Sequence, residues 1–256
     1  MDGVVGLFEL YFCGMIDDGD AWAEGLGEGE IRVLTTDDGT KTLYLPGMDE
    51  TYHSTHGAMT ESSHVYIQNG LDFWLSENPG AKSVRVFEMG LGTGTNALLA
   101  MDWCERTGCA VEFYTVEKFP LSETLMRDYW GDTVYAERSE ALHASAWELW
   151  IEIPLLQGEF KVFKHQSDIQ TAAIPLAMDV VFWDAFGPNK QDGVWGTELF
   201  QPIFNAMQQG GVFVTYSSAG DVKRALKQVG FGVEKLDGPP FKRHMLRAIK
   251  TNSNGL

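Results

Sequence analysis

The chain has 256 residues, of which 44% are hydrophobic, and its formal net charge is −17. This length suits one α/β domain with a small subdomain, and this composition excludes an intrinsically disordered protein. The sequence contains three cysteines and no apolar run as long as the roughly 18 residues that a membrane span requires. So few cysteines argue against a disulfide framework and for a reducing compartment. We therefore expect a cytoplasmic protein without a membrane partner, and we take a monomer as the default.

The charge is distributed unevenly along the chain. Residues 1–30 contain eight acidic residues and neither lysine nor arginine, whereas the basic carboxy-terminal segment, residues 221–256, contains eight basic and three acidic residues. An acidic surface repels nucleic acid, but this basic segment could bind a polyanion. An ordinary solvated helix face explains the segment equally well.

The first part of the chain predicts a loose extension and a small subdomain. Residues 1–30 are rich in glycine and acidic residues and lack periodicity, which is typical of a loose extension. Two β-prone runs, 32–36 and 42–45, flank an Asp-Asp-Gly turn and predict a hairpin. A capped start at Thr60 predicts a helix up to Gly70. We assign residues 31–80 to this hairpin and helix subdomain.

From Val84 onwards, strand-like and helix-like segments alternate. Strands are predicted over residues 84–88, 111–116, 160–164, 180–183 and 211–216. Helices are predicted over residues 96–107, 135–153, 197–207 and 221–228, together with one that begins near 122 and a short one after 168. A final hairpin is predicted over 231–236 and 245–249. This alternation predicts an α/β, Rossmann-like domain over 81–250, with a mostly parallel seven-stranded sheet, helices on both faces and a tail at 251–256.

A glycine-rich turn joins the first of these strands to the first helix. Gly90, Gly92 and Gly94, followed by Thr95, form the pattern GxGxGT. A strand, a glycine turn and a helix present backbone N–H groups and the positive end of the helix dipole to a ligand. The spacing differs from the dinucleotide fingerprint, and the turn lacks the lysine of a P-loop. A glycine turn without a ligand is the alternative.

This turn resembles the E-x-G-x-G-T-G-x-N loop of Rossmann-type S-adenosylmethionine (SAM) methyltransferases. The resemblance implies a SAM methyltransferase fold with SAM as cofactor. It also implies cofactor contacts from Glu88, from the three glycines, from Thr95 and from Asn96.

Four acidic residues end or follow successive predicted strands: Glu88, Glu117, Asp168 and Asp184. Ligands of an open α/β sheet bind at the carboxyl ends of its strands, and clustered carboxylates repel one another unless they have a use. We expect Glu117 to accept hydrogen bonds from both ribose hydroxyls of SAM and Asp168 to accept one from the adenine amino group. Glu88 is expected to lie at the methionine end of SAM. Helix caps or solvated acids are the alternative.

Asp184 begins a loop that contains Phe186, Pro188, Lys190 and Trp195. A carboxylate at the end of an apolar strand, followed by such a loop, indicates a reaction site. We expect Asp184 to hold an amine nucleophile or to accept a proton from it. An N-cap or turn aspartate is the alternative.

No metal site is predicted. His53 and His56 could pair on a metal, but no second Cys/His cluster and no HExxH pattern accompanies them. We therefore expect loop or surface histidines. Cys104 and Cys109 have no matching partner pair and are expected to be structural.

Further blocks resemble the methyltransferase domain of the MnmC family. They are EKFPL (117–121), WDAF (183–186) with its loop, YSSAG (216–220), KRHML (242–246) and the earlier DETYHSTHGAMTESSHVYI (49–67). The resemblance covers about residues 32–250. It implies SAM-dependent methylation of the exocyclic amine of 5-aminomethyl-(2-thio)uridine at the wobble position of tRNA. It also implies a cofactor contact from Lys118, and substrate contacts from Tyr52, Glu61, Phe186, Pro188, Lys190, Trp195, Ser217, Lys242 and Arg243.

The chain also departs from this family. Bifunctional members continue into an FAD-dependent oxidase domain, for which a chain ending at Leu256 has no room, so we expect a stand-alone version that needs the free aminomethyl substrate. His244 stands where the family usually has glutamate. Because the whole chain is acidic, tRNA binding should depend on the basic carboxy-terminal segment. Two alternatives are another amine-directed SAM enzyme, such as an aminopropyltransferase or small-molecule N-methyltransferase, and a SAM-binding module without catalysis.

Overall fold

The computed structural model describes residues 31–191 and 193–251. Within these residues, eight strands form one sheet, in the order β10 (Gly232–Asp237), β11 (His244–Ile249), β9 (Met207–Thr215), β8 (Met178–Trp183), β4 (Ser83–Met89), β5 (Ala110–Glu117), β7 (Phe160–Gln166) and β6 (Trp150–Ile153). The five strands from β9 to β7 are parallel, and β10, β11 and β6 pair antiparallel at the two edges. The predicted Rossmann-like fold is confirmed.

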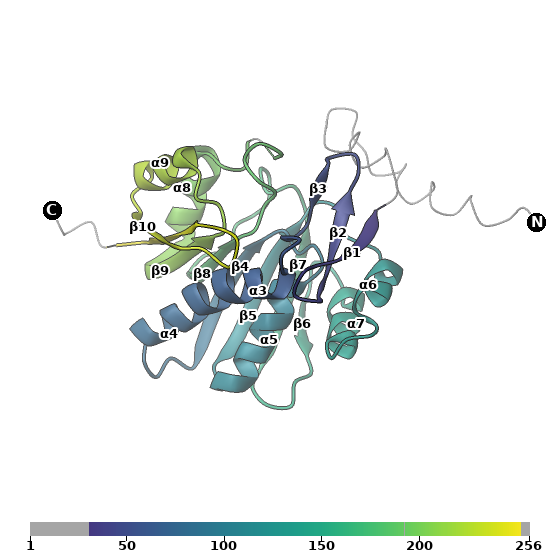
Figure 1. The fold of residues 1–256 in the computed structure, drawn as a ribbon. Coiled ribbons are helices and arrows are strands. Elements are labelled where there is room, and N and C mark those ends of the chain that lie inside the picture. Colours follow the sequence, from purple (N-terminus) through teal and green to yellow (C-terminus); the bar gives the residue numbers. More distant parts are fainter. Residues whose placement is uncertain (1–30, 192, 252–256) are drawn as a thin grey trace, which may run out of the picture.

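Helices cover both faces of this sheet (Figure 1). Successive strand residues point to opposite faces, and in β8 Phe182 belongs to one apolar core and Trp183 to the other. The first face packs against an N-terminal helical segment and against α5 (Thr95–Thr107), α6 (Glu123–Trp130) and α7 (Ala136–Ala144). The second face packs against α8 (Thr197–Ala206) and α9 (Gly220–Gln228).

The N-terminal helical segment is continuous and consists of α3 (Ala58–Ser62), η1 (Ser63–Asp72) and α4 (Phe73–Glu77). It confirms the predicted helix and extends it at both ends. Its middle part, η1, is a π-helix, a rare form that is frequent at functional sites. At Gly70, a Cβ atom would lie 3.2 Å from side-chain atoms of both Phe182 and Val214. Glycine at this position therefore lets η1 pack closely on β8 and β9.

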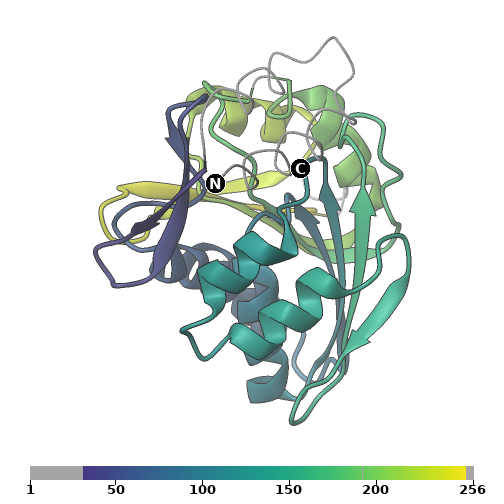
Figure 2. The same ribbon diagram turned by 90° about the vertical axis from the view of Figure 1, so that its right-hand side faces the viewer.

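A small antiparallel sheet, made of β1 (Arg32–Thr35), β2 (Lys41–Leu45) and β3 (Glu50–Thr51), precedes this segment and confirms the predicted hairpin. Figure 2 shows it beside the loop that joins β10 to β11. There His56, just after β3, stacks on Phe241 of that loop, with ring centroids 4.3 Å apart. This contact thus joins the segment after β3 to the loop between β10 and β11, which is far away in the sequence.

Two predicted elements are wrong. The predicted helix over 135–153 ends as α7 at Ala144, because Ser145 takes an extended backbone (φ −62°, ψ 148°). The alternating Trp-Ile-Glu-Ile that follows forms the edge strand β6 instead, which gives the described sheet eight strands rather than seven. The short helix predicted after Asp168 is a turn, in which the backbone N–H groups of Thr171 and Ala172 bond to the Asp168 carbonyl.

The remaining predictions concern the cysteines, the amino-terminal extension and membrane spans. Cys104 and Cys109 are buried free thiols, in agreement with a structural role. Cys13 and the predicted extension 1–30 lie outside the described residues. None of the described helices has the length and apolar character needed to cross a membrane.

Candidate active site

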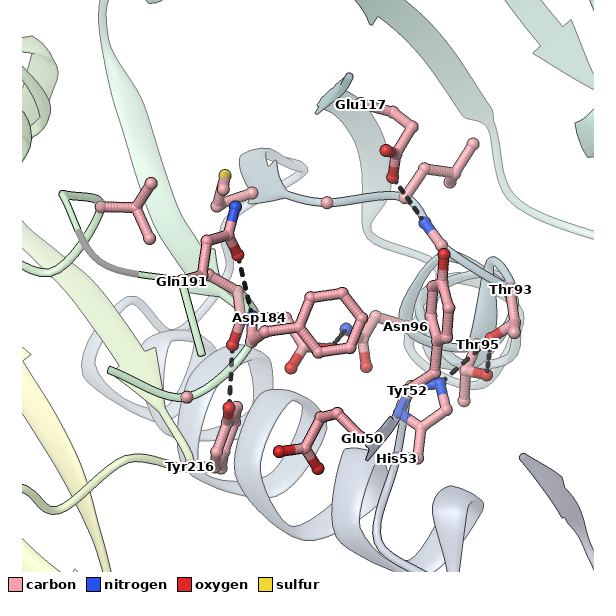
Figure 3. Close-up of a pocket in the computed structure, with 18 of the residues that line it drawn as sticks. Glu50, Tyr52, His53, Thr93, Thr95, Asn96, Glu117, Asp184, Gln191 and Tyr216 are labelled. Carbon is pink, nitrogen blue, oxygen red and sulfur yellow. Dashed lines mark hydrogen bonds between the residues drawn. The ribbon is translucent and has the colours of Figure 1, made fainter. Parts of the chain in front are cut away.

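The carboxyl ends of β4, β5 and β8 meet at one edge of the sheet. The strand order reverses here, because β5 and β7 follow on one side of β4 while β8 and β9 follow on the other. In open α/β sheets, ligands bind at such a switch point. A cavity of about 440 Å³ lies at this place, surrounded by acidic, aromatic and amide side chains (Figure 3). This cavity is the candidate active site.

The predicted glycine turn forms one wall of the cavity. Gly90, Gly92 and Gly94 have φ angles of 88°, 50° and 78°, in the region that favours glycine. A Cβ atom at Gly92 would also lie 3.0 Å from two ring carbons of Tyr52. The turn therefore needs glycine both for its backbone conformation and for space, and it brings the first turn of α5 to the cavity.

Glu117 ends β5 at the cavity (Figure 3). Its Oε2 accepts a hydrogen bond from the Gly92 N–H at 3.0 Å, and its Oε1 accepts one from the Phe119 N–H at 2.8 Å. Burial raises the pKa of Glu117, and these backbone hydrogen bonds oppose that shift. Both carboxylate oxygens are thus fixed in place, and each keeps a lone pair for a ligand hydroxyl.

Asp184 follows β8 and is held by side chains from two helices. Its Oδ1 accepts a hydrogen bond from Tyr66 Oη at 2.7 Å, and its Oδ2 accepts one from Asn96 Nδ2 at 2.7 Å. Burial raises the pKa of Asp184, whereas these two hydrogen bonds and the charge of Lys242 lower it. Tyr66 was not predicted as a site residue, because a tyrosine in an apolar helical run has the same pattern as a core residue.

Buried polar atoms without partners lie next to Asp184. Both carboxylate oxygens of Glu88 and the Oδ1 of Asn96 lack a hydrogen-bond partner among the described residues. Burial, and then the nearby charge of Asp184, raise the pKa of Glu88 well above its usual range, which favours a protonated side chain. Glu88 does not line the cavity, but Asn96 does. The Oδ1 of Asn96 is itself buried, so Asn96 turns its Nδ2 group to Asp184 and offers no free oxygen to a ligand in the cavity.

His53 belongs to a polar wall that the sequence analysis did not recognise. It is a loop residue, as predicted, but its ring lines the cavity rather than the surface. Its Nε2 lies 3.0 Å from Thr93 Oγ1, which lies 2.8 Å from Thr95 Oγ1. Burial lowers the pKa of His53 to about 4, so its ring is neutral at pH 7. His56, in contrast, is exposed and pairs with Asp37 at 2.6 Å.

An ion pair closes the cavity on the side of the β10–β11 loop. Lys242 Nζ lies 2.5 Å from Glu61 Oε1 and 4.1 Å from the centre of the Tyr216 ring. Tyr216 Oη donates a hydrogen bond to the carbonyl of Ala185 at 2.8 Å. The Glu61–Lys242 pair therefore connects α3 to the β10–β11 loop. It lies on Tyr216, which is bonded to Ala185 beside Asp184.

The structure brings most of the predicted site residues together. Those that line the cavity are Tyr52, Glu61, Gly90, Gly92, Thr95, Asn96, Glu117, Lys118, Asp168, Asp184, Phe186 and Lys242. Those that do not line it are Glu88, Gly94, Pro188, Lys190, Trp195, Ser217 and Arg243. Lining residues that the sequence analysis did not single out include Glu50, Gln191 and Tyr216 (Figure 3).

Two of the residues outside the cavity support its loop instead. Trp195 donates its Nε1–H to the carbonyl of Phe186 at 2.8 Å, and Lys190 Nζ donates to the carbonyl of Met48 at 2.8 Å. The first contact closes the Asp184 loop on itself, and the second holds the loop against the turn between β2 and β3. Sequence alone gives no signal that separates such supporting residues from lining ones.

The cavity carries negative charge. Asp168 pairs with Lys118 at 3.1 Å and Glu61 pairs with Lys242, but Glu50, Glu117 and Asp184 form no ion pair with a described residue. Such a site suits a cationic ligand. The described residues contain no group of three or more His, Cys, Asp or Glu side chains that could hold a metal ion.

These residues fit SAM, which carries a sulfonium, an ammonium group and two ribose hydroxyls. Glu117 would hold the hydroxyls, the glycine turn allows close approach of the backbone, and the unpaired acidic side chains of the cavity favour the two cationic groups. Asp168 already pairs with Lys118 and accepts from the Gln170 N–H at 2.9 Å. Each oxygen of Asp168 therefore keeps a lone pair for the predicted adenine contact, as each oxygen of Glu117 does for a ribose hydroxyl.

Comparisons with known proteins agree with this fit. A family profile described as S-adenosyl-L-methionine-dependent methyltransferase matches residues 136–251. Two relatives are named tRNA 5-methylaminomethyl-2-thiouridine biosynthesis bifunctional protein MnmC. The one from Paraburkholderia xenovorans is 30% identical, over 80% of this chain and 33% of its own length. The one from Idiomarina loihiensis is 35% identical, over 77% of this chain and 35% of its own length. The chain thus spans about a third of the length of these relatives.

Two solved structures are similar as well. The crystal structure of MnmC2 from Aquifex aeolicus matches with a TM-score of 0.70 and 26% identity, over 90% of this chain and 73% of that chain. Spermidine synthase from Thermotoga maritima matches with a TM-score of 0.54 and 14% identity, over 87% of this chain and 69% of that chain, which shows the fold alone.

Fold, cavity and similarities together define a SAM-dependent methyltransferase. Within this class, the chain is an MnmC-like methyltransferase domain.

Proposed function

We propose that this protein transfers a methyl group from SAM to the amine of 5-aminomethyl-(2-thio)uridine at the wobble position of tRNA, giving the 5-methylaminomethyl nucleoside. The observation that carries the proposal is Asp184, a buried carboxylate fixed by Tyr66 and Asn96 beside the glycine turn of an MnmC-like domain. Similarity to MnmC proteins over about 80% of the chain supports the choice of substrate. We also propose that the protein acts in the cytoplasm as a monomer.

The proposed chemistry assigns a proton acceptor to the reaction. A primary amine is protonated near neutral pH and attacks only after it has lost that proton. Asp184 accepts the proton, and the neutral nitrogen then bonds to the methyl carbon as the carbon–sulfur bond breaks, which leaves a protonated secondary amine. Bound SAM would supply a methyl group that is already activated, so orientation in the cavity contributes most of the acceleration.

The negative cavity would also accept a small polyamine. Glu50, Glu117 and Asp184 have no basic partner among the described residues, and a polyamine carries several ammonium groups. This second candidate calls for the same assay with a different acceptor.

The test incubates the protein with SAM and with tRNA from cells that lack this methyltransferase, followed by mass spectrometry of the digested nucleosides. We expect conversion of the 5-aminomethyl to the 5-methylaminomethyl nucleoside. A parallel reaction replaces tRNA with putrescine. Methylation of putrescine but not of tRNA, with SAM binding intact, would overturn the proposed substrate and leave the assignment as a SAM methyltransferase standing.

A further inference from the structure

Phe241, in the loop between β10 and β11, holds a large apolar side chain open to solvent. Its exposed fraction is 74%. Its φ angle is 71°, a left-handed conformation that bulky residues rarely adopt and that clusters at functional sites. Exposure and strain at the same residue call for an explanation beyond the fold.

The ring of Phe241 is held in a fixed orientation. It stacks on His56 with centroids 4.3 Å apart and an angle of 27° between the ring planes. His56 is in turn oriented by Asp37, whose Oδ2 lies 2.6 Å from His56 Nδ1. One face of the phenyl ring is therefore supported, while the ring stays open to solvent as a rigid aromatic plane.

This plane lies at the rim of the candidate active site. Lys242 follows Phe241 directly and lines the cavity, and Thr55 lines it directly before His56. Arg243, the next residue, is exposed. An aromatic plane beside cationic side chains is how proteins bind single-stranded nucleic acid without sequence preference.

We propose that Phe241, supported by His56, is a stacking platform for an RNA base next to the nucleotide that enters the cavity. The proposal rests on the proposed function, because an enzyme that modifies a base in RNA must take that nucleotide out of its stack. The neighbouring base then loses a stacking partner, and the Phe241 ring replaces it. Stacking of this kind adds affinity and tolerates any base.

The test uses an anticodon stem–loop RNA that carries 5-aminomethyluridine at the wobble position. We expect Phe241→Ala to raise both the Kd and the KM for this RNA about tenfold, and Phe241→Trp to keep most of the affinity. The Kd for SAM should stay unchanged, which separates lost stacking from a damaged fold. Leu156→Ala is the matched control, since Leu156 is 94% exposed and lies between β7 and the edge strand β6, on the opposite side of the sheet from β10.

Two further measurements identify the interaction as stacking. The loss in Phe241→Ala should be the same at low and at high salt, because an uncharged side chain releases no counterions. An RNA in which the flanking nucleotide is abasic should bind the wild type about tenfold more weakly and bind Phe241→Ala with no additional loss.

The outcomes separate this proposal from the proposed function. RNA affinity that is equal in the wild type and in Phe241→Ala would show that the platform does not exist, even if methylation occurs. Binding that depends on Phe241, without methylation, would overturn the proposed function and leave the platform standing. No measurable RNA binding by the wild type would overturn both.

Discussion

Single hydrogen bonds decide what Asp184 can do. Its carboxylate is buried, which raises its pKa, but Tyr66 and Asn96 donate to both oxygens and keep the charged form accessible. A carboxylate balanced in this way can hold an ammonium group and also take its proton. Burial and the nearby charge of Asp184 raise the pKa of Glu88 well above its usual range, and Glu88 does not line the cavity, so it is not suited to the same task.

We expect Asp184→Asn to lower kcat by about 10² to 10⁴, the usual contribution of a general base. An asparagine keeps the shape of the side chain but accepts no proton. The Kd for SAM, measured by calorimetry, should change little. If SAM affinity falls as much as turnover does, Asp184 binds the cofactor and not the amine.

Glu117→Ala should have the opposite effect. The KM for SAM should rise by about 10-fold to 100-fold, because hydrogen bonds to a charged group are lost, while kcat at saturating SAM stays close to that of the wild type. Steady-state kinetics with varied SAM measure both constants. Glu112→Ala is the control on the same strand, since Glu112 pairs with Arg85 at 2.9 Å, away from the cavity. An unchanged KM in Glu117→Ala would contradict the ribose contact.

Among the elements, the β1–β2 turn is attached to α3 through Asp38. The side chain accepts hydrogen bonds from the hydroxyls of Thr36 (2.7 Å), Thr40 (2.6 Å) and Thr60 (2.8 Å). Burial opposes ionisation of Asp38, but these hydrogen bonds outweigh it and lower its pKa to about 2. The ionised form of one exposed residue thus orients the small sheet that carries Tyr52 to the cavity.

Asp38→Asn should lower Tm at pH 7 by about 2–4 °C, which corresponds to about 1 kcal/mol of lost hydrogen bonding. Because the folded-state pKa lies below the unfolded value, the stabilisation is complete above pH 4 and is lost as the pH falls toward 2. Scanning calorimetry of both proteins between pH 7 and pH 3 should therefore show a narrowing difference in Tm. Asp132→Asn, at an exposed position, is the control. A difference in Tm that does not change with pH would show that the charge of Asp38 does not stabilise the fold.

Local patterns predicted the elements on which the candidate active site is built. The glycine turn and the acids at the strand ends are visible in the sequence because each depends on a few neighbouring residues, as Gly92 and Glu117 show. Tyr66, His53 and β6 were missed or misassigned because tertiary contacts determine them. Tyr66 acquires its role only where η1 crosses β8, and the edge strand β6 exists only because β7 offers it a partner.

On the scale of the whole molecule, an acidic protein must present a local positive surface to RNA. Some basic side chains of the carboxy-terminal segment are neutralised, since Arg224 pairs with Asp221 and Arg247 pairs with Glu234. Lys227, Lys235 and Arg243 are exposed. These three side chains lie on α9, on β10 and in the loop that reaches the cavity.

Binding of tRNA should therefore weaken steeply with salt, because each phosphate contact releases a counterion. We expect Arg243→Ala to reduce the slope of log Kd against log salt concentration by about one. Arg106→Ala should leave the slope unchanged, since Arg106 pairs with Asp72 at 2.6 Å at the far end of α5. Filter binding at several salt concentrations measures these slopes. Equal slopes in the wild type and in Arg243→Ala would place the RNA elsewhere on the surface.

The π-helix η1 makes the length of residues 63–72 as important as their identity. Each of its turns contains one residue more than an α-helical turn, and η1 holds both Tyr66 at Asp184 and Gly70 against the sheet. Deletion of a single residue between them, such as Gln68, would rotate one part of the helix against the other by about 80°, because a π-helical turn holds between four and five residues. Only one of the two contacts could then survive. In this segment, evolution can exchange side chains far more freely than it can add or remove a residue.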